Sequence, residues 1–455
     1  MRQAAQRDRR WVFGLGALVV LGALGIAWSA RTPSASHASP PPASDFVGLG
    51  EPTAGGASGG RSRLAAPARP ATFDPELLAY DAGCVDLSSA ASLNESVRSG
   101  LGPLVAFDAV HSTPLDGGGQ FWLVQDAYLN FTGAPPVALP DLQYTNNLAV
   151  VFDPAGCGTV LVRPPNENRR VSFEYGTGEV TRGRYFWPLG LQSGPDGVTV
   201  VWTVMQLSEE EPGAWEGIAR HPVDTWIATY DPETFERLDF EPAPDPGVDP
   251  QWGFEMQTQG DWTYLFGNAN LLNLARSGGI DNGPHPSTEM FVARVRSGAV
   301  TDRPAVWDGR TWSSDDGIRP ASISTRGWFS NQMHPRRIGE TWVSVTTAEE
   351  FWGNELVVDV ASRPEGPWYE AKRIDVDRDR PDADQVSYHP TLLPVAADAT
   401  TVPIAVSYNA AVWEEALADP TRYRPEFLDL DLDELRRALA RSEALQIATL
   451  DTSGG

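Results

Sequence analysis

Short stretches of alternating or β-branched hydrophobic residues recur along the chain, and they are separated by Gly, Pro and Asn. Five of these stretches end in a small polar turn. A second stretch of similar shape follows each of them. Patterns of this kind predict β-strands joined by turns. The first members of the pairs are 120–128, 198–205, 261–270, 340–348 and 401–411, and the second members start at 146, 224, 288, 354 and 443.

A further short strand is predicted before each pair, at 104–112, 185–192, 252–259, 331–338 and 386–394, and outer strands are predicted from Gly158 and Trp368. Modules of about four antiparallel strands in series indicate an all-β protein built as a five-bladed β-propeller. A large β-sandwich is the alternative, but the recurrence of one three-strand order favours the propeller. The predicted blades are 103–165, 183–243, 250–313, 320–377 and 385–451.

The last predicted blade lacks an outer strand, and a strand near 77–88 is expected to supply it and close the ring. Both cysteines, Cys84 and Cys157, lie in the folded part, and a disulfide between them would join this strand to the first blade. Two buried free thiols are the alternative. The last blade also carries a long insertion, which predicts an amphipathic helix at the rim, either a lid or a cap. Its leucines at helical spacing are Leu428, Leu432, Leu435 and Leu439.

The N-terminus combines four arginines within its first ten residues with an uncharged apolar run, Trp11–Trp28. This order predicts a signal peptide or signal anchor over 1–28 and an extracytoplasmic protein, secreted or anchored. Residues 29–70 are rich in Ser, Ala, Pro and Gly and are expected to be a disordered linker. The folded part is therefore expected at 71–455, with membrane contact only through the N-terminal segment.

The net charge of −25 argues against nucleic acid or an anionic membrane surface as partner. No P-loop, GxGxxG, GxSxG or HExxH motif is present, so no cofactor is expected to be required. The acidic run 375–384 lacks the Gly and Glu of an EF-hand loop, which favours a solvated loop. No metal site is predicted, and a structural calcium ion in the channel has only weak support.

Candidate site residues emerge when the five first strands are aligned on their polar or aromatic position. This alignment places one residue from each blade at the channel: Asp108, Trp187, Glu255, His334 and His389. The ends of second strands add Asp126, Asn268, Asn270 and Asn409, and the starts of third strands add Glu289 and Glu355. Carboxylates and amides bind hydroxyl groups and indole rings stack on sugars, so these residues predict a glycan site.

With its blade pattern, its two His-Pro first strands and Asp108 at the first blade's inner edge, the chain resembles five-bladed propeller glycosidases of the arabinanase and β-xylosidase kind. It is also similar to related secreted bacterial propellers of unassigned function. The resemblance covers 103–451. It implies Asp108 as base, Glu255 as acid and Asp126 as third carboxylate, although in the relatives the third residue belongs to a middle blade. Arabinose- or xylose-type glycans are the substrates that it favours.

Two carboxylates on opposite sides of a channel would lie about 6.5–9.5 Å apart, which predicts an inverting glycosidase. The main alternative is a non-catalytic propeller that binds glycan or protein at the cell surface. A third is a structural envelope protein whose funnel is plugged by the insertion. An ion pair between either carboxylate and Arg336 or Arg337 would favour binding over catalysis.

Overall fold

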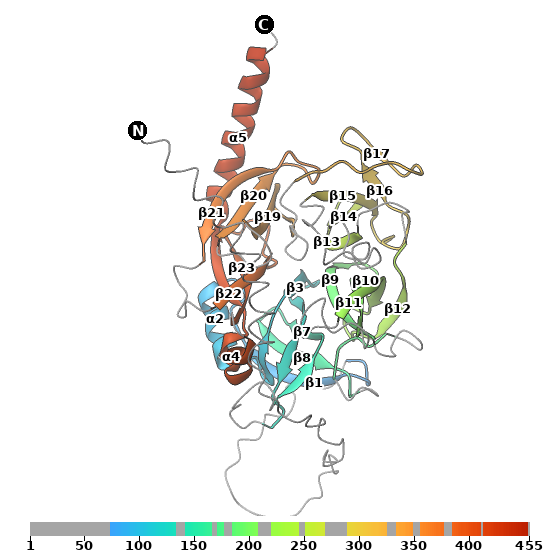
Figure 1. The fold of residues 1–455 in the computed structure, drawn as a ribbon, viewed down its shortest axis with the longest axis vertical. Helices are drawn as coiled ribbons and strands as arrows, with labels where there is room; N and C mark the ends of the chain where they lie inside the picture. Colours follow the sequence, from blue (N-terminus) through green and yellow to red (C-terminus); the bar gives the residue numbers. More distant parts are fainter. Residues whose placement is uncertain are drawn as a thin grey trace, which may run out of the picture. The chain divides into compact units, whose positions relative to one another are not determined.

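β-Strands dominate the part of the chain that the computed structural model describes, so the predicted all-β class is confirmed (Figure 1). The predicted leader and linker, 1–70, lie outside this part. No helix within the described ranges is long and apolar enough to cross a membrane. The described residues are 73–132, 142–165, 171–176, 184–207, 220–244, 251–268, 289–324, 334–348, 355–376, 385–410 and 413–453.

The first sheet has the strand order β1-β8-β7-β4-β3. Its strands are β1 (Leu78–Cys84), β3 (Val110–Pro114), β4 (Gln120–Val124), β7 (Leu148–Phe152) and β8 (Cys157–Val162). A small sheet has the order β2-β5-β6. Each of its strands is separated by two residues from a strand of the first sheet: β2 from β3, β5 from β4, and β6 from β7. Its strands are β2 (Leu104–Phe107), β5 (Ala127–Leu129) and β6 (Gln143–Thr145).

In the second and third sheets the strands are neighbours in chain order, so the first strand of each segment, β9 or β13, lies at one edge of its sheet. The second sheet has the order β12-β11-β10-β9, with β9 (Arg184–Gly194), β10 (Gly197–Leu207), β11 (Arg220–Tyr230) and β12 (Arg237–Pro242). The third has the order β13-β14-β15-β16-β17, with β13 (Gln251–Gln259), β14 (Trp262–Asn268), β15 (Met290–Arg296), β16 (Ala305–Trp307) and β17 (Trp312–Ser313).

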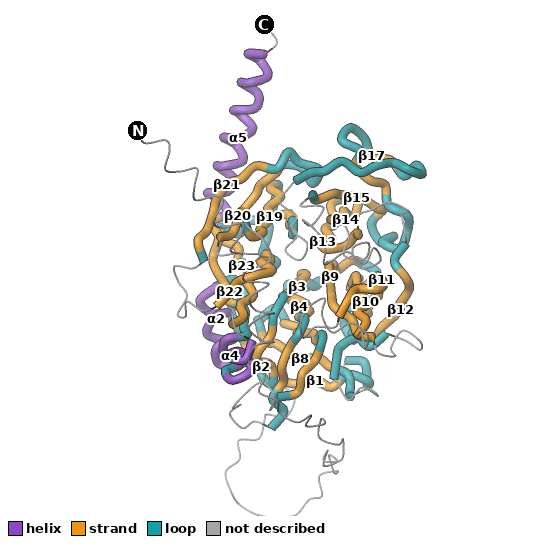
Figure 2. The backbone as a smooth tube through the Cα atoms, viewed as in Figure 1, coloured by secondary structure: helices purple, strands orange, loops and turns teal. Residues whose placement is uncertain are grey.

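The fourth and fifth sheets repeat this meander (Figure 2). The fourth contains β18 (Arg336–Ile338), β19 (Thr341–Thr347), β20 (Glu355–Ala361) and β21 (Tyr369–Asp375). The fifth contains β22 (Gln385–Leu392), β23 (Thr401–Ala410) and β24 (Glu426–Asp431). The helices are α2 (Ala90–Ser99), α4 (Trp413–Ala418), the 3-10 turn η3 (Pro420–Arg422) and α5 (Leu432–Ser453).

A buried hydrophobic cluster joins each large sheet to the next, and another joins the fifth sheet to the first. Burial of such clusters is the main stabilising term of the fold, at about 25 cal/mol per Å² of apolar surface. The first-to-fifth contact includes stacking of Trp122 on Phe427, with ring centroids 6.1 Å apart. The clusters between successive sheets include Leu123 and Phe186, Val201 and Met256, Phe266 and Trp342, and Val343 and Ile404.

The expected closing strand occupies a different place from the one predicted. β1 pairs with β8 and forms the outer edge of the first sheet, not of the fifth. The disulfide between Cys84 and Cys157 is confirmed, and the two cysteines are direct partners in this strand pair. The outer side of the fifth sheet is instead contacted by α2, where the Asn94 side chain bonds both the N–H and the C=O of Phe427.

The predicted strand at 443–451 is wrong, because its residues belong to α5. The segment Glu426–Asp431, with alternating leucine and aspartate at 428–431, forms β24, which pairs with β23 and takes the third-strand position of the fifth sheet. Leu428 therefore lies in a strand, and the helix begins at Leu432. The following segment is rich in Ala, Leu, Glu and Arg, which are strong helix formers.

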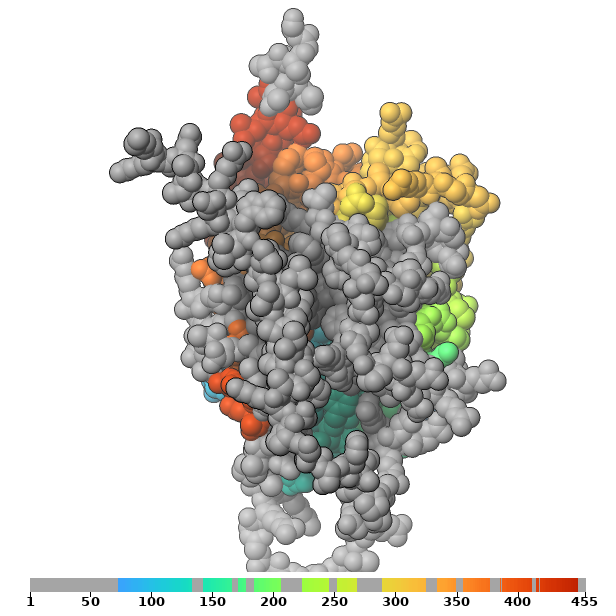
Figure 3. Space-filling view, viewed as in Figure 1, coloured from blue at the N-terminus to red at the C-terminus, as the bar shows by residue number. Residues whose placement is uncertain are grey.

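α5 packs on the fourth and fifth sheets through Leu432, Leu435 and Leu439, and Lys372 of β21 bonds Glu434 at 2.7 Å. Residues 444–448 are exposed, with Leu445 at 70% and Ile447 at 62%. In the space-filling view the described part of the C-terminal helix, in red, stands at the surface (Figure 3). Of the two expectations, a lid or a cap, the described contacts fit a cap, because the helix covers apolar surface of the fourth and fifth sheets and has no described contact with the candidate site residues.

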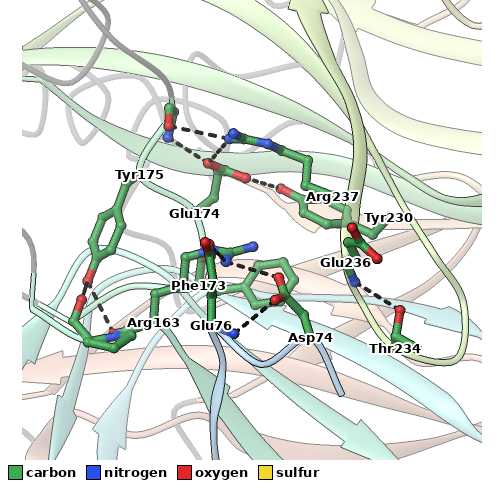
Figure 4. Close-up of polar contacts among 12 residues, drawn as sticks. Asp74, Glu76, Arg163, Phe173, Glu174, Tyr175, Tyr230, Thr234, Glu236 and Arg237 are labelled. Atoms are coloured by element: carbon green, nitrogen blue, oxygen red, sulfur yellow. Dashed lines mark hydrogen bonds and ion pairs between the residues drawn. The ribbon is translucent and has the colours of Figure 1, made fainter. Parts of the chain in front are cut away.

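A polar network joins the beginning of the described chain to the first two sheets (Figure 4). Arg163, at the end of β8, bonds Asp74 at 3.1 Å and Glu76 at 2.9 Å. The buried carboxylate of Glu174 accepts from the Tyr230 hydroxyl at 2.6 Å and from Arg237 at 2.7 Å. Because burial and the Glu174 charge both oppose ionisation, the pKa of Tyr230 lies well above its usual value. These groups satisfy one another, which indicates a structural role.

Candidate functional site

The five aligned residues all lie on, or directly beside, the strand at one end of each large sheet. Trp187 lies in β9, Glu255 in β13 and His389 in β22, while Asp108 precedes β3 and His334 precedes β18. The structure brings them into two groups. Asp108 and Trp187 belong to a cluster of carboxylates and aromatic rings, whereas Glu255, His334 and His389 belong to a cluster of imidazoles.

Asp108 lies at the break between β2 and β3, where Ala109 has a positive φ of 42° and its N–H bonds the Ser407 hydroxyl. The carboxylate is 7% exposed, and its Oδ2 accepts from the hydroxyls of Tyr388 and Tyr423, each at 2.6 Å. Burial, and then the charge of Asp108, hold the pKa of both tyrosines well above the usual value. Both phenols are therefore neutral at physiological pH and donate to the Asp108 carboxylate.

Asp126 lies at the corresponding break between β4 and β5, and its side chain is partly exposed. Its Oδ1 accepts from the Trp187 indole at 2.9 Å and from the Asn146 amide at 3.2 Å. Its backbone C=O accepts from the Asp108 N–H at 3.3 Å. Asp108 and Asp126 thus lie on adjoining strand breaks, and the charge of Asp126 contributes to the raised pKa of the two tyrosines that bond Asp108.

Aromatic rings surround the two carboxylates. The ring of Tyr128 lies 5.2 Å from Tyr144 and 5.9 Å from Tyr423, measured between centroids. Tyr185 packs edge-on against Trp187 at 5.6 Å. Trp187 and Tyr144 are partly exposed. Exposed aromatic faces beside carboxylates are the side-chain chemistry that binds sugar rings and organic cations.

Glu255 has a different environment from the two aspartates. Its carboxylate lies 3.5 Å from Nδ1 of His334 and 3.8 Å from the guanidinium of Arg336, and it accepts from Gln257 at 3.1 Å. Arg336 is itself buried and donates to the Ser112 carbonyl at 2.6 Å. The second sheet approaches closely at Gly190, where an added Cβ would lie 3.0 Å from Glu255 Cα. Glu255 is thus a buried ion-pair partner of Arg336.

Three buried imidazoles meet beside Glu255. Ring centroids of His111, His334 and His389 are separated by 6.0 Å, 5.0 Å and 4.9 Å. Burial, and then the neighbouring imidazoles, lower the pKa of His111 well below its usual value and that of His389 to about 3. These two rings are therefore neutral at physiological pH.

The two clusters are neighbours through Gln125, the residue before Asp126. Its side-chain amide donates to the Pro188 carbonyl at 3.0 Å and lies 3.4 Å from Nε2 of His111. Within the described ranges, no group of three or more His, Cys, Asp or Glu side chains is arranged to hold a metal ion.

The remaining predicted residues divide into three kinds. Asn409 lies in β23, two residues after the Ser407 that bonds the strand break at Ala109. Glu355 begins β20 and pairs with Arg373, and Glu289 is exposed before β15. Neither has a described contact with the two clusters. The side chain of Asn268 and all of Asn270 lie outside the described residues, as does most of the acidic run 375–384.

Sequence reasoning did not select Tyr388, Tyr423 or His111 as site residues, and it named Arg336 only as a possible ion-pair partner of a carboxylate. Tyr388 and His111 stand within three residues of predicted site positions, which was the available signal. Tyr423 comes from the insertion between β23 and β24, and its carbonyl accepts from Phe107 N–H at 3.0 Å. The insertion therefore does reach the site, through η3 and its following residue and not through α5.

The fold and site together define an all-β protein with a pair of carboxylates set among aromatic rings. The chain belongs to the family described as Domain of unknown function (DUF5005), whose model matches residues 101–431. No curated protein matches the chain at a significant level.

Solved structures give a likeness in fold. A candidate hydrolase from Bacteroides ovatus ATCC 8483 is 13% identical, with a TM-score of 0.50 over 80% of this chain and 92% of that one. A GH43_1 enzyme from Xanthomonas citri is 12% identical, with a TM-score of 0.36 over 72% and 88%. A thermostable family-43 glycoside hydrolase is 12% identical, with a TM-score of 0.37 over 70% and 88%. The similar structures thus include enzymes of glycoside hydrolase family 43.

Proposed function

We propose that the five large sheets are the blades of a five-bladed β-propeller. Support comes from the hydrophobic clusters, which join each sheet to the next and the fifth to the first. A cyclic order of contacts is what a propeller requires, because each blade covers the face of its neighbour. In this arrangement, the residues before or within β3, β9, β13, β18 and β22 line the central channel.

The function that the site supports best is a carbohydrate-active enzyme of the glycoside hydrolase type. The observation that carries it is the pair Asp108 and Asp126, one buried and one partly exposed, beside the accessible indole of Trp187. Most glycosidases cleave the glycosidic bond with a pair of carboxyl groups whose environments keep them in different protonation states. Asp126 is the group that meets the reacting atoms, and Asp108, held by two tyrosine hydroxyls, is the fixed negative charge.

Arabinose- and xylose-containing glycans are the first substrates to test, because family-43 structures are among those similar to the chain. The reaction needs no cofactor, and its inverting outcome stays a prediction. We place the protein outside the cytoplasm, which the disulfide supports because such bonds persist in oxidising compartments. The basic and apolar N-terminal segment would direct this export, and it is the only part expected to contact a membrane.

A second function, glycan recognition without cleavage, is favoured by Glu255. Its burial between His334 and Arg336 makes it an ion-pair partner, so the acid that the resemblance implies is not free to protonate a leaving group. In this case Asp108, Asp126 and Trp187 would form a recognition surface only.

The test compares reducing-end release by the purified full chain and by Asp126→Asn, Asp108→Asn and Glu255→Gln on arabinan, xylan and bacterial cell-wall glycans. Glu340→Gln is the matched control, because its side chain is 94% exposed. Release that is lost in both aspartate variants and kept in the control supports hydrolysis. Binding with no release by any form supports recognition alone, and neither binding nor release refutes both functions.

A further inference from the structure

Tryptophan and arginine side chains gather on one face of the third sheet. Trp262 of β14 pairs with Arg296 of β15, and Tyr264 pairs with Arg294. Because alternate residues of a strand share a face, these four side chains project from the same face of the sheet. Trp262 is the first residue of β14 and Asn268, which was predicted at the channel, is the last. This group and the predicted channel position thus lie at opposite ends of one strand.

Ring faces hold the two arginines. Cζ of Arg294 lies 4.1 Å from the ring centroid of Trp262 and 4.5 Å from that of Trp312 in β17. Cζ of Arg296 also lies 4.1 Å from the Trp262 centroid, so both guanidinium groups lie beside the same indole. Trp307 of β16 continues the series, with its centroid 5.4 Å from that of Trp312. We refer to these three tryptophans and two arginines as the tryptophan–arginine row.

The tryptophan–arginine row is open to a ligand. Its three tryptophans and Arg294 are partly exposed, and the side chain of Arg296 is 64% exposed. β17 forms the outer edge of the third sheet, and residues of this region, in yellow, stand at the surface in Figure 3. Arg296 has one described ion pair, with Asp261 at 3.6 Å, and both side chains are exposed. Exposed ion pairs contribute little free energy, so another anion can replace Asp261 at small cost.

The chemistry of stacked arginine favours a carboxylate as ligand. A guanidinium that stacks on an indole keeps its N–H groups at its edge, where they bind a carboxylate through two parallel hydrogen bonds. Stacking also restrains the side chain, so less conformational entropy is lost when these bonds form. Indole rings in turn pack on the apolar faces of sugars. Indoles and guanidinium groups side by side are therefore complementary to a sugar that carries a carboxylate.

We propose that the tryptophan–arginine row is a second glycan site, which binds the uronic acid units of an acidic polysaccharide. Arg294 and Arg296 pair with the sugar carboxylates, and Trp307 packs on a neighbouring sugar ring. The net charge of −25 repels acidic polymers in general, so their selective binding has to come from a local group of arginines such as this one. The inference goes beyond the proposed function, because it concerns another part of the third sheet and requires no cleavage.

The experiment measures binding of two probes to the purified full chain by titration calorimetry near neutral pH. The probes are a galacturonic acid tetramer and its fully methyl-esterified form, which have the same linkage and differ in charge. We expect about tenfold tighter binding of the acidic tetramer, the combined effect of two charge-assisted contacts at a partly exposed surface. Added salt is expected to reduce this difference.

Arg296→Gln and Arg294→Lys are each expected to remove most of the preference for the acidic probe. Lysine keeps the charge but lacks the planar fork, so Arg294→Lys separates bidentate binding from simple attraction. Arg98→Gln makes the same charge change as Arg296→Gln at a 68% exposed side chain of α2, and this control keeps the preference. Trp187→Leu, in the candidate site, also keeps it.

Equal or weaker binding of the acidic tetramer overturns the proposal. So does a preference that survives both arginine variants, or one that is lost in Trp187→Leu, which would assign the acidic ligand to the candidate site. Thermal unfolding verifies the folding of each variant, and Arg296→Gln alters a side chain that is already largely exposed. Hydrolysis is measured separately on other glycans, so failure of this proposal leaves the proposed function untouched.

Discussion

Acid is expected to destabilise the fold through the imidazole cluster, and His389 gives the magnitude. Its pKa is about 3 in the folded protein, against about 6.5 in an unfolded chain. On acidification, the unfolded state binds this proton at a higher pH than the folded state does. The contribution of His389 to the free energy of unfolding is therefore full above the unfolded pKa of about 6.5, and it is lost as the pH falls to the folded pKa of about 3. Linkage gives a loss of about 2 kcal/mol between pH 8 and pH 5, and about 4 kcal/mol by pH 3.

Neighbouring charged groups do not reverse the expected loss of stability at low pH. His111 contributes in the same direction, because its pKa is also well below the usual value. Arg336 is a buried cation nearby, and Glu255, 3.5 Å from His334, is the one described counter-charge in contact with the cluster. A second positive charge among these rings would therefore be poorly compensated.

The assay is urea unfolding of the wild type and of His389→Asn at a series of pH values from 8 to 5. Asparagine is the suitable replacement, because it tolerates the positive φ of 50° at this position. The stability difference at pH 8 reports lost packing, and its change with pH isolates the titration. We expect the variant to lose about 2 kcal/mol less than the wild type over this range. Parallel pH profiles for the two proteins would refute the reasoning.

Three further changes test the contacts that hold the sheets. Glu174→Ala leaves the partly buried Arg237 and the buried Tyr230 hydroxyl without their acceptor and is expected to cost about 3 kcal/mol in urea unfolding. Arg98→Ala, in an exposed ion pair, should cost less than about 0.5 kcal/mol, and equal costs would contradict the structural role of Glu174. Replacing Cys84 and Cys157 by alanine opens a 73-residue loop and should lower the free energy of unfolding by about 2–4 kcal/mol. An unchanged melting temperature would contradict a stabilising role of the disulfide. Asn94→Ala removes two hydrogen bonds to the fifth sheet and should lower the free energy of urea unfolding by about 1–2 kcal/mol. A loss equal within error to that of Arg98→Ala would show that these bonds do not stabilise the contact between α2 and the fifth sheet.

Much of the fold could be predicted because its strands are short, alternating and separated by turn residues. The outer strands at Gly158 and Trp368 follow from such local signals. The disulfide follows instead from the presence of two cysteines in a folded part that is expected to be exported. The partner of β1 could not be predicted, because both the first and the fifth sheet offered an open edge. The end of the chain was misjudged since 443–451 has hydrophobic residues at spacings that fit either structure, and only the pairing of β24 with β23 decides between them.

The candidate site was predicted less completely for a geometric reason. Alignment of the first strands selected one residue per sheet, but it assumed regular strands. The structure departs from regular pairing at these places: β2 and β3 are interrupted at Asp108, the register of β13 shifts before Glu255, and that of β22 shifts at His389. A shift of one residue reverses the side on which a side chain lies. Tyr388 therefore turns toward Asp108, a contact that strict alternation would not indicate.

These irregularities explain why the polar residues gather where they do. A regular inner strand can present alternate residues only, and its ladder occupies the backbone groups. The breaks at Asp108 and Asp126 free the backbone to make other bonds, such as that from Ala109 N–H to Ser407 and that from Asp108 N–H to Asp126. Bulges and breaks are common beside active sites because they re-aim side chains. That two sequentially distant carboxylates share one aromatic environment is thus a result of the strand breaks, and the same breaks would position them on a bound sugar.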